Sequence, residues 1–287
     1  MKWTRGYRSD DVEVRQGNGG GGGGGGLPLG LLSLITSRFG IGGGLLALLA
    51  FGAWQFLSGR MTQGEGAVDP SDPTAKTQSA DERVQFASFV LDDVQRTWAQ
   101  KIPGYKNAKM VLFQNSTSTG CGYGDKATGP FYCPRDNNVY LDLDFFKTLE
   151  QRLGAGGDFA QAYVIAHEVG HHVQNQLGVS DKVSGATSRA RTGAGGLGVK
   201  LELQADCFAG VWAHSSEQRK LLETGDLEEA LNAVASIGDD RLQKMNQGTV
   251  QPESWTHGSS AQRVDWFRRG LKSGDPASCD TFQIAAP

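Results

Sequence analysis

Two histidines separated by three residues, His167 and His171, stand with Glu168 in the sequence HEVGH. In an α-helix, a step of four residues advances slightly more than one turn, so both imidazoles lie on one side of the helix. Two such imidazoles can bind one Zn²⁺ ion, and the carboxylate of Glu168 can act on a water molecule held by the metal. The pattern therefore predicts one zinc ion with His167 and His171 as ligands and Glu168 as general base. A helix that carries these residues without a metal is the less favoured alternative.

A catalytic zinc ion needs a third protein ligand and one position open to water. Glu202 is the best candidate, because it stands in a largely apolar run, residues 201–212, four residues before a second acid, Asp206. Side chains four residues apart on a helix face the same neighbour. Glu202 could therefore bind the metal while Asp206 accepts a hydrogen bond from a ligand histidine. The alternative is an exposed acidic face beside Lys200, but the apolar surroundings favour burial, where unpaired acids are costly.

The remaining histidines are expected to have different roles. His257 precedes a helix that Ser259 can cap, and from there it could donate a hydrogen bond to the oxyanion of a tetrahedral intermediate. A loop histidine without a role is the alternative for that position. His172 points about 100° away from His171 around the helix, so it is not expected to share the metal and should either support a ligand or lie at the surface. His214 is expected to be structural. Tyr163, one turn before His167, is a weaker donor candidate and is expected to lie in the core.

The sequence GAGGLG at residues 193–198 matches the glycine pattern of dinucleotide-binding loops. It does not follow a strand, and no strand–helix–strand unit surrounds it, so the pattern does not predict a nucleotide site. We expect a flexible connection between the two metal-binding helices.

Apolar periodicity and turn residues predict a body that is α+β and predominantly helical. Asp158 is expected to cap the helix that carries the two metal-binding histidines, and Gly178 fits its exit. The expected strands are residues 109–114 and 138–144. The expected helices are residues 81–100, 159–176, 199–215, 227–237, 239–247 and 260–272.

An uncharged segment of 21 residues, 39–59, lies between Arg38 and Arg60. As a helix it would span roughly 30 Å, the thickness of a bilayer's hydrocarbon core. The segment predicts a single transmembrane helix rather than a buried soluble helix or a cleaved signal peptide. The predicted organisation is a flexible glycine-rich tail over residues 1–26, a membrane segment over 27–59, a linker over 60–80 and a zinc-binding domain over 81–287.

Basic residues before the apolar segment predict the orientation. Residues 1–60 carry six Lys and Arg against three acids, which favours an amino terminus in the cytoplasm. The body is then expected in the periplasm or outside the cell, attached to the inner membrane. The net charge of the chain is −3, which argues against binding to nucleic acid. The sequence favours no particular oligomeric state.

Four cysteines, all in the body, are compatible with two disulfides. Cys121 and Cys133 close a short loop and are the first choice, which leaves Cys207 with Cys279. Free, buried thiols are the alternative.

Several segments together resemble a family of bacterial neutral zinc metallopeptidases. They are the amino-terminal residues with their glycine tract, the membrane segment, GPFYCP (129–134), HEVGHHVQ (167–174), LELQADCFAGVWA (201–213) and THGSSAQRVDWF (256–267). HExxH followed by ExxxD also resembles the gluzincin class. The resemblance implies a zincin-like domain with His167, His171 and Glu202 as ligands, Glu168 as base and Asp206 as partner of a ligand histidine.

The predicted function is a membrane-anchored zinc peptidase that hydrolyses bonds in a peptide or protein substrate. The alternative is a non-catalytic envelope scaffold or partner-binding protein stabilised by zinc. A structural zinc site would be closed by a fourth protein ligand, such as His172 or a cysteine.

Overall fold

The computed structural model describes residues 1–15, 73–125 and 128–283, with side chains in the first helix from residue 80 onward. The chain divides into a larger unit, residues 1–17 with 77–287, and residues 18–76, and almost all of the described residues belong to the larger unit. The expected membrane segment, the octaglycine tract and most of the expected linker lie outside the described residues. Among the helices that are described, none combines the length and apolar character needed to cross a membrane.

The larger unit contains a four-stranded sheet in the order β1-β2-β6-β5. The strands are β1 (Val12–Arg15), β2 (Lys109–Phe113), β5 (Phe131–Cys133) and β6 (Asn138–Asp142). β2 pairs in parallel with both β1 and β6, whereas β5 is antiparallel to β6. A separate hairpin consists of β3 (Ser116–Thr119) and β4 (Gly122–Asp125). β2 and β6 confirm the two predicted strands.

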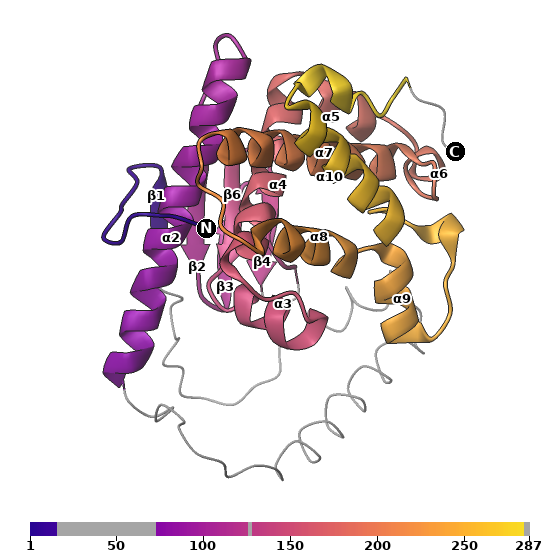
Figure 1. Cartoon of the computed structure of the whole chain (residues 1–287). Coiled ribbons are helices and arrows are strands. Elements are labelled where there is room, and N and C mark those ends of the chain that lie inside the picture. Colours follow the sequence, from indigo (N-terminus) through magenta and orange to yellow (C-terminus); the bar gives the residue numbers. More distant parts are fainter. Residues whose placement is uncertain (16–72, 126–127, 284–287) are drawn as a thin grey trace, which may run out of the picture. The chain divides into compact units, whose positions relative to one another are not determined.

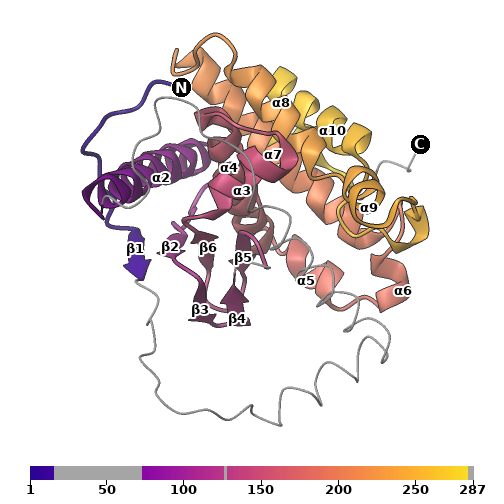
Figure 2. The same cartoon turned by 90° about the horizontal axis from the view of Figure 1, so that it is seen from below.

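Both faces of the sheet are covered, as its central parallel strands require. Met110 and Leu112 of β2 join the main hydrophobic core, while the alternate residues Val111 and Phe113 belong to a smaller cluster. Helices α2 and α4 lie over the first face (Figure 2). The alternation explains why β2 is apolar at every position after its first residue.

The structure corrects the expectation of a flexible tail over residues 1–26. Residues 1–15 are folded onto the body: Val12 pairs with Met110, and the amine of Met1 lies 2.6 Å from Asp158 and 3.2 Å from Asp226. Trp3 packs edge-on against Phe86 with ring centroids 5.5 Å apart. A four-residue strand with a partner so distant in sequence leaves no local periodic signal, so the expectation missed it.

The helices largely follow the predicted ranges. α2 begins at Pro73, so residues 73–80, expected in the linker, are helical. Asp158 does not cap its helix: the N-cap is Gly157, and Asp158 is the first helical residue and pairs with the Met1 amine. The helices are α2 (Pro73–Lys101), α3 (Phe145–Leu153), α4 (Asp158–Gln176), α5 (Val179–Ser184), α6 (Ser188–Arg191), α7 (Leu197–Gln218), α8 (Asp226–Ser236), α9 (Asp239–Gln247) and α10 (Ser260–Ser273), with short 3₁₀ turns η1 (Pro252–Ser254) and η2 (Pro276–Cys279).

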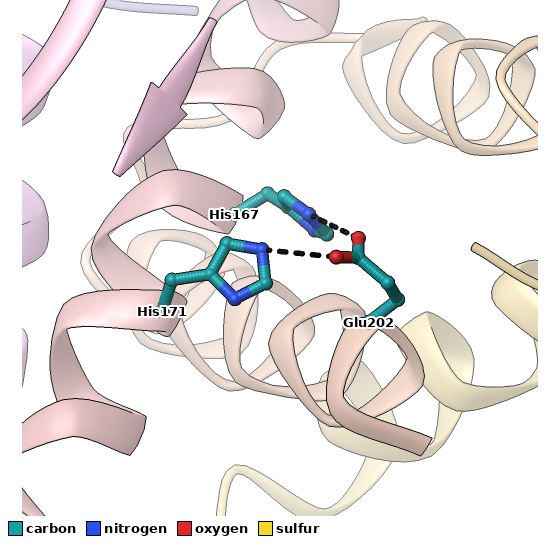
Figure 3. A group of neighbouring side chains, drawn as sticks. All are labelled: His167, His171 and Glu202. Atoms are coloured by element: carbon teal, nitrogen blue, oxygen red, sulfur yellow. Dashed lines mark hydrogen bonds and ion pairs between the residues drawn. The ribbon is translucent and has the colours of Figure 1, made fainter. Parts of the chain in front are cut away.

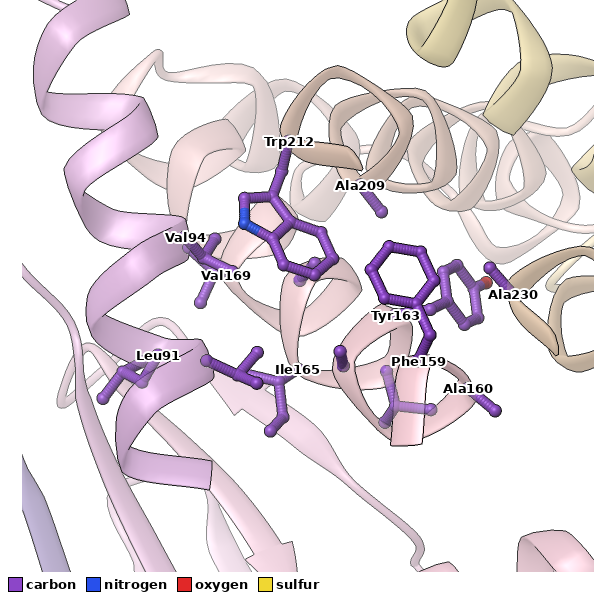
Figure 4. Close-up of a cluster of buried hydrophobic side chains, with 14 of the residues drawn as sticks. Leu91, Val94, Phe159, Ala160, Tyr163, Ile165, Val169, Ala209, Trp212 and Ala230 are labelled. Atoms are coloured by element: carbon purple, nitrogen blue, oxygen red, sulfur yellow. The ribbon is translucent and has the colours of Figure 1, made fainter. Parts of the chain in front are cut away.

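α4 lies between α2 and the group formed by α7, α8 and α10 (Figure 1). Its side chains point in both directions (Figure 4): Ile165 and Val169 contribute to the core with Leu91 of α2. Phe159 stacks on Trp212 of α7 at a centroid distance of 5.4 Å. Because α4 is buried all round, its histidines are held in a rigid setting.

Glycines set the close crossing of α7 and α10. A Cβ atom on Gly210 would lie 2.1 Å from the carbonyl oxygen of Phe267, and one on Gly270 would lie 1.9 Å from that of Cys207. Real Cβ atoms do not approach so closely, so any larger residue would push the helices apart. On α4, a Cβ on Gly170 would already lie 3.1 Å from the Ala205 carbonyl oxygen. These contacts bring α7 close enough to α4 for their polar side chains to meet.

Both predicted disulfides are confirmed. Cys121 is bonded to Cys133, and Cys207 is bonded to Cys279. The first attaches the turn of the β3–β4 hairpin to the end of β5, and the second attaches η2 to α7. The first four residues of the GAGGLG sequence, 193–196, lie between α6 and α7, and the last two, 197–198, begin α7. The sequence therefore does not by itself connect the two metal-binding helices, because α5 and α6 also lie between them.

Candidate metal centre

His167 and His171 of α4 and Glu202 of α7 converge on one point (Figure 3). The Nε2 atom of His167 lies 3.2 Å from Oε2 of Glu202, and Nε2 of His171 lies 3.5 Å from Oε1. One ligand atom from each residue can be chosen so that all three lie within 4.8 Å of one another. Two imidazole nitrogens and a carboxylate are a donor set typical of catalytic zinc.

The other ring nitrogen of each histidine is engaged by a protein group. Nδ1 of His167 lies 2.9 Å from Oδ1 of Asp206, and Nδ1 of His171 lies 2.8 Å from Oε1 of Gln174. Hydrogen bonds at Nδ1 leave the Nε2 lone pairs directed toward Glu202. The sequence predicts that Asp206 accepts a hydrogen bond from one of the two ligand histidines but does not indicate which one. In the structure that histidine is His167.

Asp206 is completely buried and accepts hydrogen bonds from three residues. The hydroxyl of Tyr163 lies 2.6 Å from Oδ1, and Arg263 donates through Nε to Oδ2 at 2.7 Å and through Nη2 to Oδ1 at 3.0 Å. Tyr163 is buried as expected, but its hydroxyl donates to Asp206 instead of serving as the weaker donor candidate of the cleft, and the sequence did not point to Arg263. Arg263 lies in the THGSSAQRVDWF segment, but its inward direction depends on the α7–α10 crossing.

Charge in the site suits a divalent cation. Burial disfavours the charged form of His167, but Asp206 and Glu202 outweigh burial in the absence of a metal ion and raise the pKa of His167 to about 10. Burial also opposes ionisation of Asp206, yet Arg263 and His167 lower its pKa. The pKa of Glu202 is likewise lowered by His171 and His167 against the effect of burial. Both carboxylates are therefore ionised at neutral pH.

The three converging residues line a cleft of about 630 Å³, together with Glu168 and His257. Glu168 is 8% exposed and lies on α4 beside His167. Much of the remaining wall is apolar and includes Phe131, Phe145, Val164, Val183 and Leu201. A partly apolar cleft of this size with a few converging polar groups is typical of a ligand-binding site.

His257 is positioned by Asp239, a residue that sequence reasoning did not single out. Nδ1 of His257 lies 3.2 Å from Oδ1 of Asp239, and the same carboxylate accepts the backbone N–H groups of Thr256, His257 and Gly258. The hydrogen bond to Asp239 raises the pKa of His257, although burial opposes this effect. His257 lies in an irregular bend between η1 and α10, and the Asp239 carboxylate holds that bend through the three backbone N–H groups.

The other two histidines lie apart from the centre, and His172 is buried rather than at the surface. Both ring nitrogens of His172 are occupied, Nδ1 by the Tyr132 hydroxyl at 3.0 Å and Nε2 by the Lys106 carbonyl at 2.7 Å. Nδ1 of His214 lies 2.7 Å from the Leu271 carbonyl. All four cysteines are in disulfides. Within the described ranges, the three-residue group thus acquires no fourth His, Cys, Asp or Glu ligand.

Comparison with known proteins adds an independent observation. A family described as "Putative neutral zinc metallopeptidase" matches residues 1–282. The chain belongs to this family. The resemblance seen in the sequence is therefore confirmed, and the chain is a member of a zinc peptidase family whose substrates are peptides or proteins.

Two relatives of this zinc metallopeptidase illustrate the extent of similarity. YpfJ of Escherichia coli (strain K12) is 47% identical over 292 residues, covering 98% of this chain and 99% of the relative. Rv2575 of Mycobacterium tuberculosis (strain H37Rv) is 47% identical over 205 residues, covering 68% of this chain and 69% of the relative. No solved structure matches the chain.

Proposed function

We propose that this chain is a membrane-attached peptidase that uses one zinc ion bound by His167, His171 and Glu202 to hydrolyse peptide bonds. The observation that carries the proposal is that the Nε2 atoms of both histidines converge on the Glu202 carboxylate, while both Nδ1 atoms are hydrogen-bonded to other protein side chains. The ionised acids and the two imidazoles fit Zn²⁺ in number and in ligand type. Bound there, zinc would lower the pKa of a coordinated water and polarise the substrate carbonyl.

Glu168 and His257 supply the protein's part of the chemistry. Glu168, adjacent to His167 in the cleft, accepts the proton of the attacking water and passes it to the leaving amine. His257 donates a hydrogen bond to the oxygen on which negative charge develops. Asp239 directs the His257 ring, so that the donor is positioned before the reaction begins.

The alternative of a closed, structural zinc site receives no support from the described residues. His172 is bonded to Tyr132 and Lys106, and the cysteines are paired with one another. Three protein ligands with a cleft at the fourth side are the arrangement of catalytic rather than structural zinc.

Membrane attachment rests on the apolar sequence of residues 39–59, and the compartment rests on the two disulfides, which are typical of oxidising environments. The parallel pairing of β1 with β2 supports a change to the expected orientation. Strands that share backbone hydrogen bonds cannot be separated by a bilayer. We therefore propose that residues 1–15 and the body lie together on the outer side of the inner membrane, in place of the predicted single crossing with a cytoplasmic amino terminus.

The proposal is tested by incubating the full chain with a diverse peptide library, with and without a zinc chelator. Zinc-dependent cleavage is expected, and Glu168→Gln should bind zinc as tightly as the wild type while losing turnover by at least about 100-fold, as expected for loss of a general base. Glu150→Gln, on the neighbouring helix α3, is the matched control and should retain full activity. Unchanged turnover in Glu168→Gln would exclude that residue as the base.

A further inference from the structure

We propose that Gln174 is a positioning residue for His171, held by a relay of amide hydrogen bonds that ends at the Cys279 carbonyl. The inference rests on the proposed function, because it takes His171 to be a metal ligand. It concerns residues outside the ligand set and gives a role to the two glutamines of the HEVGHHVQ and LELQAD segments.

The relay consists of three hydrogen-bonding steps through the protein interior. Oε1 of Gln174 lies 2.8 Å from Nδ1 of His171, and Nε2 of Gln174 donates to Oε1 of Gln204 at 3.1 Å. Nε2 of Gln204 then donates to the Cys279 carbonyl at 3.0 Å. Gln174 is fully buried and Gln204 is 6% exposed, so protein groups rather than bulk water satisfy these amides.

The direction of each amide determines the tautomer of His171. Nε2 of Gln174 also donates to the Leu201 carbonyl at 2.7 Å, so its two donor hydrogens have acceptors and its oxygen must face His171. A carbonyl oxygen can only accept, so Nδ1 of His171 carries the hydrogen. The lone pair is then on Nε2, the atom that faces Glu202.

The two ligand histidines are thus oriented by different chemistry. His167 is held by the charged Asp206, which Arg263 neutralises. His171 is held by neutral amides: the Leu201 carbonyl accepts one hydrogen of Gln174, and the amide oxygen of Gln204 accepts the other. Because Gln204 keeps its oxygen toward Gln174 by donating to the Cys279 carbonyl, the orientation of His171 depends in part on a residue that lies far away in the sequence.

The Cys207–Cys279 disulfide fixes that neighbour. Cys207 lies on α7 three residues after Gln204, and its bond to Cys279 holds the η2 turn over the same face of the helix. A second attachment, from the Thr281 hydroxyl to the Lys200 carbonyl at 2.7 Å, lies on the other side of the relay. Loss of the disulfide should therefore loosen the Cys279 carbonyl without releasing the segment completely.

The experiment measures zinc affinity of the full chain by competition with a chelator. Gln174→Leu removes both amide functions at nearly constant volume and should weaken zinc binding about 10- to 100-fold, the usual effect of losing a partner of a metal-binding histidine. Gln174→Glu keeps an oxygen for Nδ1 and should recover part of the loss. Gln176→Leu is the matched control, since Gln176 bonds to the Lys106 backbone outside the relay; its affinity should remain within about twofold of wild type.

The disulfide is tested with the double variant Cys207→Ala, Cys279→Ala, because thiol reductants bind zinc themselves. This double variant should weaken zinc binding less than Gln174→Leu does. When the disulfide change is combined with Gln174→Leu, the loss of zinc-binding free energy should be smaller than the sum of the two separate losses, because both changes act on one relay. Gln204→Leu interrupts the relay one step farther from His171 and replaces Gln174→Leu if that variant does not fold. Thermal unfolding of the metal-free variants separates a local effect from loss of the fold.

Two results would overturn the inference in distinguishable ways. If folded Gln174→Leu binds zinc within twofold of the wild-type affinity, Gln174 and its relay do not position His171, although the proposed metal site would still stand. Unchanged zinc affinity in His171→Ala would instead show that the proposed metal site itself is wrong.

Discussion

Arg263 donates hydrogen bonds to both carboxylate oxygens of Asp206, with Nε 2.7 Å from Oδ2 and Nη2 3.0 Å from Oδ1. Both residues are almost completely excluded from solvent. The pair connects α10 with α7 and, through the hydrogen bond between Asp206 and His167, with the metal-binding face of α4. A buried carboxylate needs such a cation to remain ionised, so the orientation of His167 depends on a residue of the carboxyl-terminal helix.

Replacing Arg263 should therefore damage both stability and metal binding. Arg263→Gln leaves Asp206 buried without its cation, and the free energy of unfolding should fall by about 3–5 kcal/mol. Denaturant titration measures this loss, and zinc competition should show weaker binding in the folded variant. Arg268→Gln, at an exposed position of the same helix, is the control. A stability equal to that of the control would contradict the structural role given to the pair.

Zinc affinity should rise with pH. Asp206 and Glu202, against the opposing effect of burial, raise the pKa of His167 to about 10 when no metal is bound. At neutral pH zinc must then displace a proton from this imidazole, and below the raised pKa the affinity should increase by up to about tenfold per pH unit. Chelator competition between about pH 6 and 9, corrected for the chelator's own protonation, measures the slope.

Asp206→Asn provides the comparison for this pH dependence. Removing the carboxylate lowers the pKa of His167, so the rise in zinc affinity should end at a lower pH than in the wild type. The affinity itself should also be weaker, since the histidine loses its charged partner. A wild-type affinity that does not change with pH would show that His167 is not the group that zinc deprotonates.

The pH dependence of kcat/KM should depend on Asp239, because Asp239 changes the pKa of His257. The hydrogen bond from Asp239 raises the pKa of His257 despite burial, so the imidazole stays protonated to higher pH than a free histidine. If the protonated ring is the donor to the oxyanion, kcat/KM falls as pH rises through this raised pKa. Asp239→Asn lowers the pKa and should move the alkaline limb to lower pH.

Asp240→Asn is the matched control for this shift, because Asp240 bonds to Ser260 and not to His257. Its alkaline limb should coincide with that of the wild type. His257→Ala should lack the limb altogether, with kcat reduced more than KM is raised. Identical profiles for Asp239→Asn and the wild type would exclude the proposed contribution of His257.

The orientation at the membrane can be tested with single cysteines, since the four native ones are in disulfides. Arg5→Cys and Gln251→Cys introduce thiols at exposed positions of the amino-terminal segment and the body. If both lie outside the inner membrane, a membrane-impermeant maleimide should label both variants in intact spheroplasts. Labelling of the residue 5 variant only after lysis would support the cytoplasmic amino terminus instead.

Local sequence patterns were enough to predict much of the candidate metal centre. The spacing of His167 and His171 depends only on the helical repeat, and the apolar residues around Glu202 indicate that its helix is buried. The same kind of local information predicted the main helices and the two central strands, whose physical cause lies within a few residues of the position concerned. The disulfide between Cys207 and Cys279, which are 72 residues apart, was predicted only as the pair left after Cys121 and Cys133.

Other features were decided by contacts between distant segments. The inward direction of Arg263, the carboxylate of Asp239 beside His257 and the pairing of β1 with β2 each require elements that are far apart in the chain to pack first. The sequence thus determined which residues could bind a metal, because helical periodicity is local. Only the tertiary structure decided which groups orient them and where the amino-terminal strand lies, because the direction of a buried side chain depends on the close approach of helices such as α7 and α10.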